Sequence, residues 1–245
     1  MTRAHTVVLV HGAWHGAWFW DAWLPLLERP GRTVVAVDLP GHGARRLPPA
    51  RFARLSIEDY ARDLAATVAS APRPIGVVAH SLGGLAAAAS AARASADAYV
   101  LVGPSPPADA DPPPLPLVPE GAPVPPPSVA EMRDRWWRRA PADCFGGLAT
   151  IHRRLGPESP VALNDRYANR VRVPPLAAPG LVVGCELDDR HDGGRIDRGT
   201  AVHLGARFEV ARGHGHAVCA ERGSEPVAAL VDEWLSGALA EPGAS

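Results

Sequence analysis

Two residue types are missing from this sequence: among its 245 residues there is no lysine and no glutamine. All 25 basic residues are therefore arginine, which excludes every mechanism that depends on a catalytic lysine. Cysteine is scarce as well, because only Cys144, Cys185 and Cys219 occur, and they are widely spaced. Three such residues suit reduced thiols in a cytoplasmic protein better than a disulfide framework.

Long apolar runs are also lacking. The chain contains no stretch of about 18 apolar residues, the length that a membrane-spanning helix needs, and no apolar signal core near its N-terminus. The formal net charge is −1, so no strong field favours nucleic acid or an anionic membrane surface. We therefore expect a soluble, cytoplasmic protein, a monomer or homodimer, whose partner is a small-molecule substrate.

What the sequence does contain is an alternation of β-rich and helix-like segments, which is typical of a parallel sheet covered by helices. Six strands are predicted, at residues 6–10, 33–37, 75–79, 98–102, 181–184 and 207–211. Helices are predicted at residues 18–28, 57–70, 82–94 and about 225–240. The fold class is therefore α/β, with about six mainly parallel strands in a single domain that spans residues 1–245.

A proline-rich segment interrupts this alternation. Residues 104–127 hold twelve prolines in twenty-four positions, which removes too many amide donors for a helix or a central strand. Ser128 and Glu131 then match the capping box of an amphipathic helix. Residues 104–178 are therefore predicted to form a proline-rich loop and a small helical cap, inserted between the fourth and fifth strands.

The stretch GVVAHSLGG, residues 76–84, ends the third predicted strand and opens an alanine-rich helix. A strand that enters a helix through one strained turn can present a serine, here Ser81, if small residues flank it. Gly83 fits this requirement, and Ala79 exceeds the usual glycine by one methyl group. A serine before a helix is more often only a cap, so this motif alone leaves both interpretations open.

Acidic residues and histidines follow the last two predicted strands. LVVGCELDDRHDGG ends the fifth strand, and ARGHGHAVCAE, with His214 and His216, ends the sixth. Each group alone is commonly a solvated loop charge or a surface histidine. However, serine, acid and histidine each follow a different parallel strand, which places all three at the edge where open α/β sheets bind ligands.

With these motifs, and with VVLVHGAWHGAW at the end of the first strand, the chain resembles the α/β-hydrolase superfamily. Within it, the chain is similar to the small branch that includes plant methyl esterases and hydroxynitrile lyases. The resemblance covers nearly the whole chain and is weak only through the proline-rich stretch. It implies an α/β-hydrolase fold with Ser81 as nucleophile, His216 as general base and Asp188 as the acid, with Asp189 and Glu186 as competing acids.

The resemblance also implies the remaining parts of a catalytic site. The oxyanion donors would be the backbone amides of Ala13 and Leu82, and His214 would be an ordinary loop histidine. No cofactor is implied. A metal is not expected either, because the loop DDRHDGGRID lacks EF-hand spacing and its histidine lacks a partner at metal spacing, so we predict a solvated loop.

Three functions are consistent with this resemblance. We favour a serine hydrolase that cleaves an ester, thioester or lactone through an acyl-serine. The alternatives are a lyase or cyclase of a biosynthetic pathway on the same fold, and a receptor-like protein with weak turnover. Cyanide elimination is not expected, because hydroxynitrile lyases of the resembling branch carry a lysine after the histidine, where this chain has Ala217.

The predicted cap is the part of the sequence that indicates the type of substrate. Pocket linings are mostly apolar and aromatic, and the cap carries Met132, Phe145 and two adjacent tryptophans. Such residues often only pack a helix onto its own protein, but neighbours on a helix lie about 100° apart, so one tryptophan should face the cleft. We expect the nearby arginines, at positions 133, 135, 138 and 139, to be solvated. The predicted substrate is medium-sized and largely apolar, and its predicted binding residues are Trp14, His80, Met132, Trp136 and Trp137.

Overall fold

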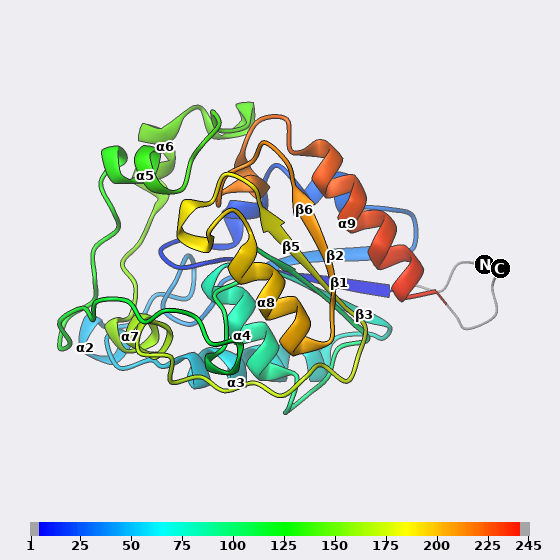
Figure 1. The fold of residues 1–245 in the computed structure, drawn as a ribbon, viewed down its shortest axis with the longest axis horizontal. Helices are drawn as coiled ribbons and strands as arrows, with labels where there is room; N and C mark the ends of the chain where they lie inside the picture. Colours follow the sequence, from blue (N-terminus) through cyan, green and yellow to red (C-terminus); the bar gives the residue numbers. More distant parts are fainter. Residues whose placement is uncertain (1–4, 241–245) are drawn as a thin grey trace.

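Six parallel strands form one sheet in the computed structural model, which describes residues 5–240 apart from the side chain of Arg190 (Figure 1). The strands are β1 (His5–Val10), β2 (Arg32–Val37), β3 (Ile75–His80), β4 (Ala98–Val102), β5 (Gly180–Cys185) and β6 (Arg207–Ala211). Their order across the sheet is β2-β1-β3-β4-β5-β6. The predicted strands are confirmed, with no boundary off by more than one residue. Residues 1–4 and 241–245 of the predicted domain lie outside the described residues.

Both faces of the sheet are apolar, because side chains alternate along each strand. In β1, Val7 and Leu9 belong to one buried cluster, whereas Val8 and Val10 belong to the other. Helices α1 (Leu24–Leu27) and α9 (Glu225–Ala238) contribute to the first cluster; α3 (Ile57–Ser70), α4 (Leu82–Ser90) and α8 (Arg195–Leu204) contribute to the second. In the described part of the chain, no helix is both long and apolar enough to cross a bilayer.

The helix predicted over residues 18–28 is wrong. The chain forms a short 3-10 helix η1 (Ala17–Trp20) and then the single-turn helix α1. Pro25 lies in the first turn of α1, where its missing N–H does no harm, but its ring would clash with a helix continuing from the N-terminal side. The helix predicted over 82–94 is shorter and ends at Ser90, whose hydroxyl donates to the Ala87 carbonyl at 2.7 Å, a bond that competes with helix continuation.

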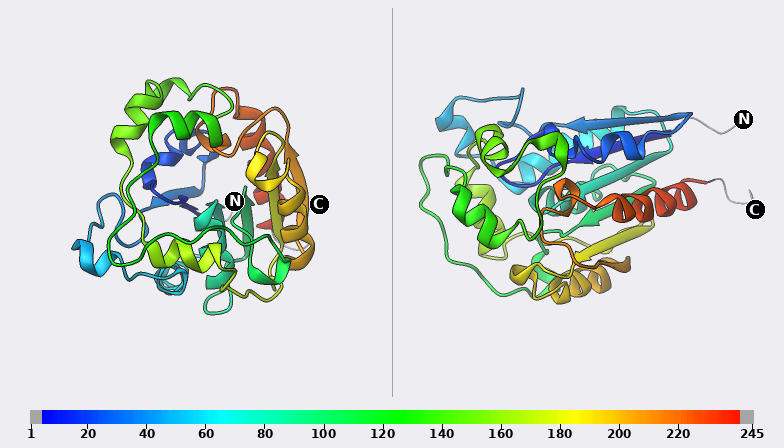
Figure 2. Two further views of the ribbon diagram at one scale, coloured as in Figure 1. Left: turned by 60° about the vertical axis from the view of Figure 1, so that its left-hand side comes forward. Right: turned by 90° about the horizontal axis from the view of Figure 1, so that it is seen from above.

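Between β4 and β5 the chain leaves the sheet, as predicted. The proline-rich stretch contains the short 3-10 helix η2 (Ala108–Ala110) and otherwise neither helix nor sheet strand within the described chain. We call residues 128–167 the cap; its helices are α5 (Val129–Arg135), η3 (Asp143–Phe145), α6 (Leu148–Arg154) and α7 (Pro160–Tyr167). The capping box at Ser128 and Glu131 is confirmed. Figure 2 shows α5 and α6 beyond the carboxyl ends of the strands.

Three short elements complete the described chain: α2 (Pro49–Phe52), η4 (Asp189–His191) and η5 (Val218–Ala220). The last two lie in the loops that follow β5 and β6. Because all six strands are parallel, these loops, the turn after β3 and the turn after β1 meet at the edge of the sheet that the cap covers.

Candidate active site

Ser81 occupies a strained turn between β3 and α4. Its backbone has φ +53° and ψ −122°, a conformation that residues with a side chain rarely adopt. The turn packs tightly against β1, because a Cβ atom at Gly83 would lie 2.2 Å from the His11 carbonyl oxygen. Ala79 is fully buried in β3, so the extra methyl group is accommodated. The turn therefore presents Ser81 at the end of the sheet, beside the N-terminus of α4.

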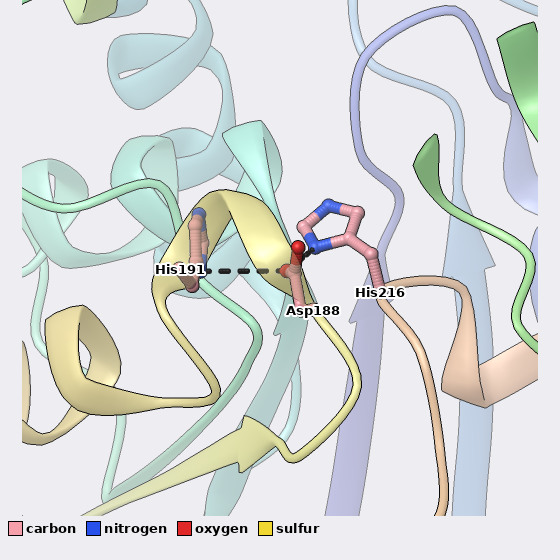
Figure 3. A group of neighbouring side chains, drawn as sticks. All are labelled: Asp188, His191 and His216. Atoms are coloured by element: carbon pink, nitrogen blue, oxygen red, sulfur yellow. Dashed lines mark hydrogen bonds and ion pairs between the residues drawn. The ribbon is translucent and has the colours of Figure 1, made fainter. Parts of the chain in front are cut away.

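A row of hydrogen bonds connects Ser81 to residues from two other loops. The Ser81 Oγ atom lies 2.8 Å from Nε2 of His216. On the other side of the ring, Nδ1 of His216 lies 2.5 Å from Oδ2 of Asp188, a contact drawn in Figure 3. Asp188 is fully buried and His216 is 5% exposed. A histidine held in this way on both nitrogens is placed to accept the serine proton while the carboxylate fixes its tautomer.

The two competing acids lie elsewhere. The Asp189 side chain is 75% exposed and forms an ion pair with Arg138. The Glu186 side chain is also exposed, and it accepts a hydrogen bond from the Gly213 amide at 2.7 Å. Of the three candidate acids, therefore, Asp188 is the one that contacts His216.

The amides of Ala13 and Leu82 belong to the two turns that meet at Ser81. Leu82 is the first residue of α4, where backbone N–H groups have no partner inside the helix. Ala13 follows Gly12, at which a Cβ atom would lie 2.9 Å from the Ser81 Cβ atom, so the two turns touch. Neither amide donates a hydrogen bond to another group of the described residues. Both are therefore available to a ligand.

A cavity of about 40 Å³ adjoins Ser81 and His216. Its other lining residues are mostly apolar or aromatic: Ala13, Trp14, His15, His80, Pro127, Met132, Trp136, Trp137, Leu155 and Ala217. These include each residue that the sequence predicted to bind substrate. Phe145 is instead 1% exposed and packs in the apolar cluster beside the 3-10 helix η1, where its ring contacts that of Trp18.

The two tryptophans reach the cavity by a different route from the one predicted. Helix α5 ends at Arg135, so Trp136 and Trp137 follow the helix, and the 100° argument does not apply to them. Both line the cavity; Trp137 is nearly buried, and Trp136 packs against Trp14 with ring centroids 5.9 Å apart. Arg138 also lies beyond the helix and pairs with Asp189.

Two sequence interpretations of the loops need correction. His214 does lie in a loop, but it is not a surface histidine, because it is 3% exposed and its Nδ1 atom lies 3.0 Å from the Glu221 carboxylate. The loop after β5 is not solvated throughout, because His191 and Asp197 are buried and hydrogen-bonded to each other at 2.8 Å. Burial follows from the way this loop folds back over β5, which its hydrophilic sequence does not reveal.

His191 also approaches Asp188, with 3.7 Å between Nδ1 and Oδ2 (Figure 3). The ligand atoms of Asp188, His191 and His216 lie within 4.8 Å of one another, close enough to bind a metal ion together. The sequence did not predict this group, because two of its members follow β5 and the third follows β6. A metal there would have to replace the hydrogen bond between His216 and Asp188.

Glu158 is a buried residue of the cap that the sequence did not single out. Its carboxylate lies 3.0 Å from Nε2 of His42 and accepts hydrogen bonds from the Trp14 amide at 3.2 Å and the Tyr60 hydroxyl at 2.7 Å. Burial alone would raise the pKa of Glu158, but the facing His42 and the hydrogen bonds outweigh it and hold that pKa below its ordinary value. No local spacing links these four positions.

Two further histidines, His11 and His15, hold the turn after β1. Burial lowers the pKa of each to about 3, so both are neutral near neutral pH. Nδ1 of His11 lies 2.8 Å from the Gly12 carbonyl oxygen, and Nδ1 of His15 lies 2.6 Å from that of Ala13. Because a carbonyl oxygen can only accept, each Nδ1 carries the hydrogen and donates it.

A strained serine turn, a hydrogen-bonded histidine and carboxylate, and a parallel sheet together define a class of protein. A model of the alpha/beta hydrolase family matches residues 7–233. The protein belongs to the alpha/beta hydrolase family, and the predicted α/β-hydrolase fold is confirmed.

Two curated relatives indicate which branch of the family the chain resembles. The chain is 38% identical over 87 residues to an alpha-hydroxynitrile lyase of Arabidopsis thaliana, which is 35% of this chain and 33% of that protein. It is 40% identical over 84 residues to methylesterase 9 of the same plant, which is 33% of this chain and 32% of the relative. The matches thus span about a third of these curated relatives.

The solved structures give a likeness over the full length. Methylesterase MES16 from Arabidopsis superimposes with a TM-score of 0.73 at 20% identity, covering 95% of this chain and 99% of that one. At this identity the likeness concerns the fold. The predicted similarity to the branch of plant methyl esterases and hydroxynitrile lyases is confirmed.

Proposed function

We propose that the protein is a serine hydrolase that cleaves an ester, thioester or lactone of a medium-sized, largely apolar small molecule. The observation that carries this proposal is the hydrogen-bonded row Ser81–His216–Asp188, with the serine on a strained turn. Similarity to methylesterase 9 supports the same class of reaction.

The proposed reaction runs through an acyl-serine intermediate. The Ser81 oxygen attacks the carbonyl carbon while its proton passes to Nε2 of His216, and the Asp188 carboxylate stabilises the imidazolium. The amides of Ala13 and Leu82 donate to the negatively charged oxygen of the tetrahedral intermediate. The leaving alcohol or thiol takes the proton from His216. Water then attacks the acyl group in the same manner, and Ser81 regains its proton.

The size of the cavity limits how a substrate enters. Ligand pockets for drug-sized molecules are roughly 300 to 1,000 Å³, whereas the cavity beside Ser81 measures about 40 Å³. A medium-sized acyl group therefore needs an outward shift of the cap residues that line the cavity. The aromatic contact between Trp14 and Trp136 closes one side of it, so Trp136 is the residue we expect to move.

A lyase function is less well supported. Ala217 follows His216 and lines the cavity, so no cation stands there to stabilise a departing anion. A fluorophosphonate probe combined with a panel of esters, thioesters and lactones tests the proposal. We expect labelling of Ser81 and turnover of at least one substrate class. Labelling without turnover would instead favour the lyase, cyclase or receptor-like alternative.

The activity is expected to fall as the pH drops below roughly 6 to 7, because a protonated histidine cannot accept the serine proton. His11 and His15, whose pKa values burial lowers to about 3, stay neutral through this range and do not contribute. The measurement is kcat/KM for one ester between pH 5 and 9. A profile that stays flat down to pH 5 would rule out histidine as the base.

Trp136→Ala is expected to raise kcat/KM for hexanoate relative to acetate about tenfold, because a larger pocket accommodates more methylene groups. The measurement is a chain-length series of p-nitrophenyl esters. The same change at Trp234, a half-buried tryptophan of α9 outside the cavity lining, is the matched control and should leave the ratio unchanged. An unchanged ratio in Trp136→Ala would show that the cap does not contact the acyl group.

A further inference from the structure

Trp14 connects the turn after β1, which contains the Ala13 amide, to the segment around Glu158. Both the backbone N–H and the backbone carbonyl of Trp14 form hydrogen bonds with this segment. The Trp14 N–H donates to Oε2 of Glu158 at 3.2 Å, and the Trp14 carbonyl accepts from the Gly156 amide at 2.9 Å. Trp14 itself has φ +63°, which is unfavourable for any residue with a side chain. These two hydrogen bonds therefore hold Trp14 in a conformation that it would not adopt alone.

The Glu158 carboxylate is a fixed acceptor. It is 1% exposed, and each of its oxygens has two partners from the protein. His42 and the Trp14 amide contact Oε2, while the Tyr60 hydroxyl and the Ser159 amide donate to Oε1 at 2.7 and 2.8 Å. The partners come from the loop after β2, the turn after β1, helix α3 and the cap. The carboxylate consequently cannot turn away from Trp14 without breaking several hydrogen bonds at once.

The orientation of successive peptide planes transmits this restraint to Ala13. In a trans peptide the N–H points opposite to the C=O, so His11, by holding the Gly12 carbonyl, directs the Ala13 N–H to the other side of the plane. The next plane is held at both ends, by His15 at the Ala13 carbonyl and by Glu158 at the Trp14 N–H. Without Glu158, this second plane has lost the acceptor that keeps Trp14 at positive φ.

We infer that Glu158 is a positioning residue for the oxyanion site: it holds the Trp14 peptide and thereby the Ala13 amide in the orientation that receives the negative oxygen. The inference rests on the proposed hydrolase function. Glu158 does not itself line the cavity beside Ser81, and it touches the lining residue Trp14 through the backbone amide, so it acts through the backbone of the turn.

Glu158→Gln is the decisive variant, because an amide has one acceptor oxygen where the carboxylate has two. The Ser159 bond at 2.8 Å is shorter than the Trp14 bond at 3.2 Å, so the oxygen should stay with Ser159 and Tyr60. The side-chain NH2 then faces His42 and the Trp14 N–H. Because an NH2 group is a donor, it cannot accept a hydrogen bond from the Trp14 N–H. We expect kcat to fall roughly 10- to 100-fold with KM within about twofold, since one misaligned oxyanion donor affects mainly the transition state.

A second measurement separates positioning from general damage. Affinity for a trifluoromethyl ketone, which forms a tetrahedral adduct with serine, should fall by the same factor as kcat, while affinity for the carboxylic acid product should stay unchanged. Asp232→Asn is the matched control, since it also removes a buried carboxylate paired with a cation, Arg32, but at the far end of the sheet. It should lower the Tm and leave kcat as in the wild type.

Glu158→Asp keeps the charge beside His42 and serves if Glu158→Gln fails to fold; its shorter side chain should still lose the Trp14 contact and lower kcat. Wild-type kcat and unchanged ketone affinity in a folded Glu158 variant would overturn the inference and leave the hydrolase proposal intact. A wild-type protein that neither reacts with a fluorophosphonate nor turns over any ester would overturn the proposed function, and with it the role of Glu158.

Discussion

Replacing Ser81 by alanine is expected to lower kcat by about four to six orders of magnitude while the Tm stays within a few degrees of the wild type. The change removes the one atom that forms the acyl intermediate. It removes little packing, because the strained turn depends on Gly83 and on the crossing of α4 over β1 rather than on the serine side chain. The measurement combines turnover of the best ester with thermal melting of the same samples.

Ser90→Ala is a suitable control for this experiment. Ser90 is a buried serine at the other end of the same helix, and its hydroxyl donates a hydrogen bond to the Ala87 carbonyl. It should keep nearly full activity. If Ser81→Ala keeps more than about a hundredth of the wild-type rate, the covalent mechanism is wrong.

Asp188→Asn is expected to lower kcat about 10⁴-fold, whereas Asp189→Asn should change it less than about twofold. The Asp188 carboxylate lies 2.5 Å from Nδ1 of His216, so an asparagine NH2 there would favour the wrong imidazole tautomer. Asp189 is a surface residue whose ion pair with Arg138 is screened by solvent. The measurement is kcat of the two variants at one pH. If Asp189→Asn lowers kcat more than Asp188→Asn does, the acid is Asp189.

The same preparations can test the metal alternative. Asp188, His191 and His216 lie close enough to bind an ion, and an ion there would also make Asp188 essential. We expect the wild type to keep its activity after prolonged treatment with EDTA, because the proposed mechanism uses these side chains as a hydrogen-bonded pair. Loss of activity that Zn²⁺ restores would show that the cluster works as a metal centre.

Local sequence patterns were sufficient to predict the sheet. Each strand is a short β-rich run bounded by turn residues, and because all six are parallel, their carboxyl ends and the following loops must share one edge. This is why a serine, an acid and a histidine, which the family resemblance assigned to Ser81, Asp188 and His216, could be expected together although up to 135 residues separate them. Helix ends were less predictable, since Pro25 and Ser90 act through single contacts that periodicity does not record.

The residues that sequence reasoning missed share a different property. Glu158, His191 and Asp197 are charged or polar residues in hydrophilic surroundings, which normally indicates exposure, yet all three are buried. Their burial depends on partners far away in the sequence or on the folding of a loop over the sheet. Such pairings follow from the tertiary fold, so one sequence read alone does not contain a signal for them.

The residues of the site follow strands that have different numbers of neighbours in the sheet. Ser81 and the Ala13 turn follow β3 and β1, which have a strand on each side, whereas His216 follows β6, which pairs only with β5. Fraying of a sheet begins at strands with one neighbour, because fewer hydrogen bonds hold them. His216, the proposed base, is therefore expected to separate from Ser81 more readily than the serine turn unfolds. We therefore expect heating to lower the rate of the proposed reaction through the local opening of one border strand, before the bulk of the molecule melts.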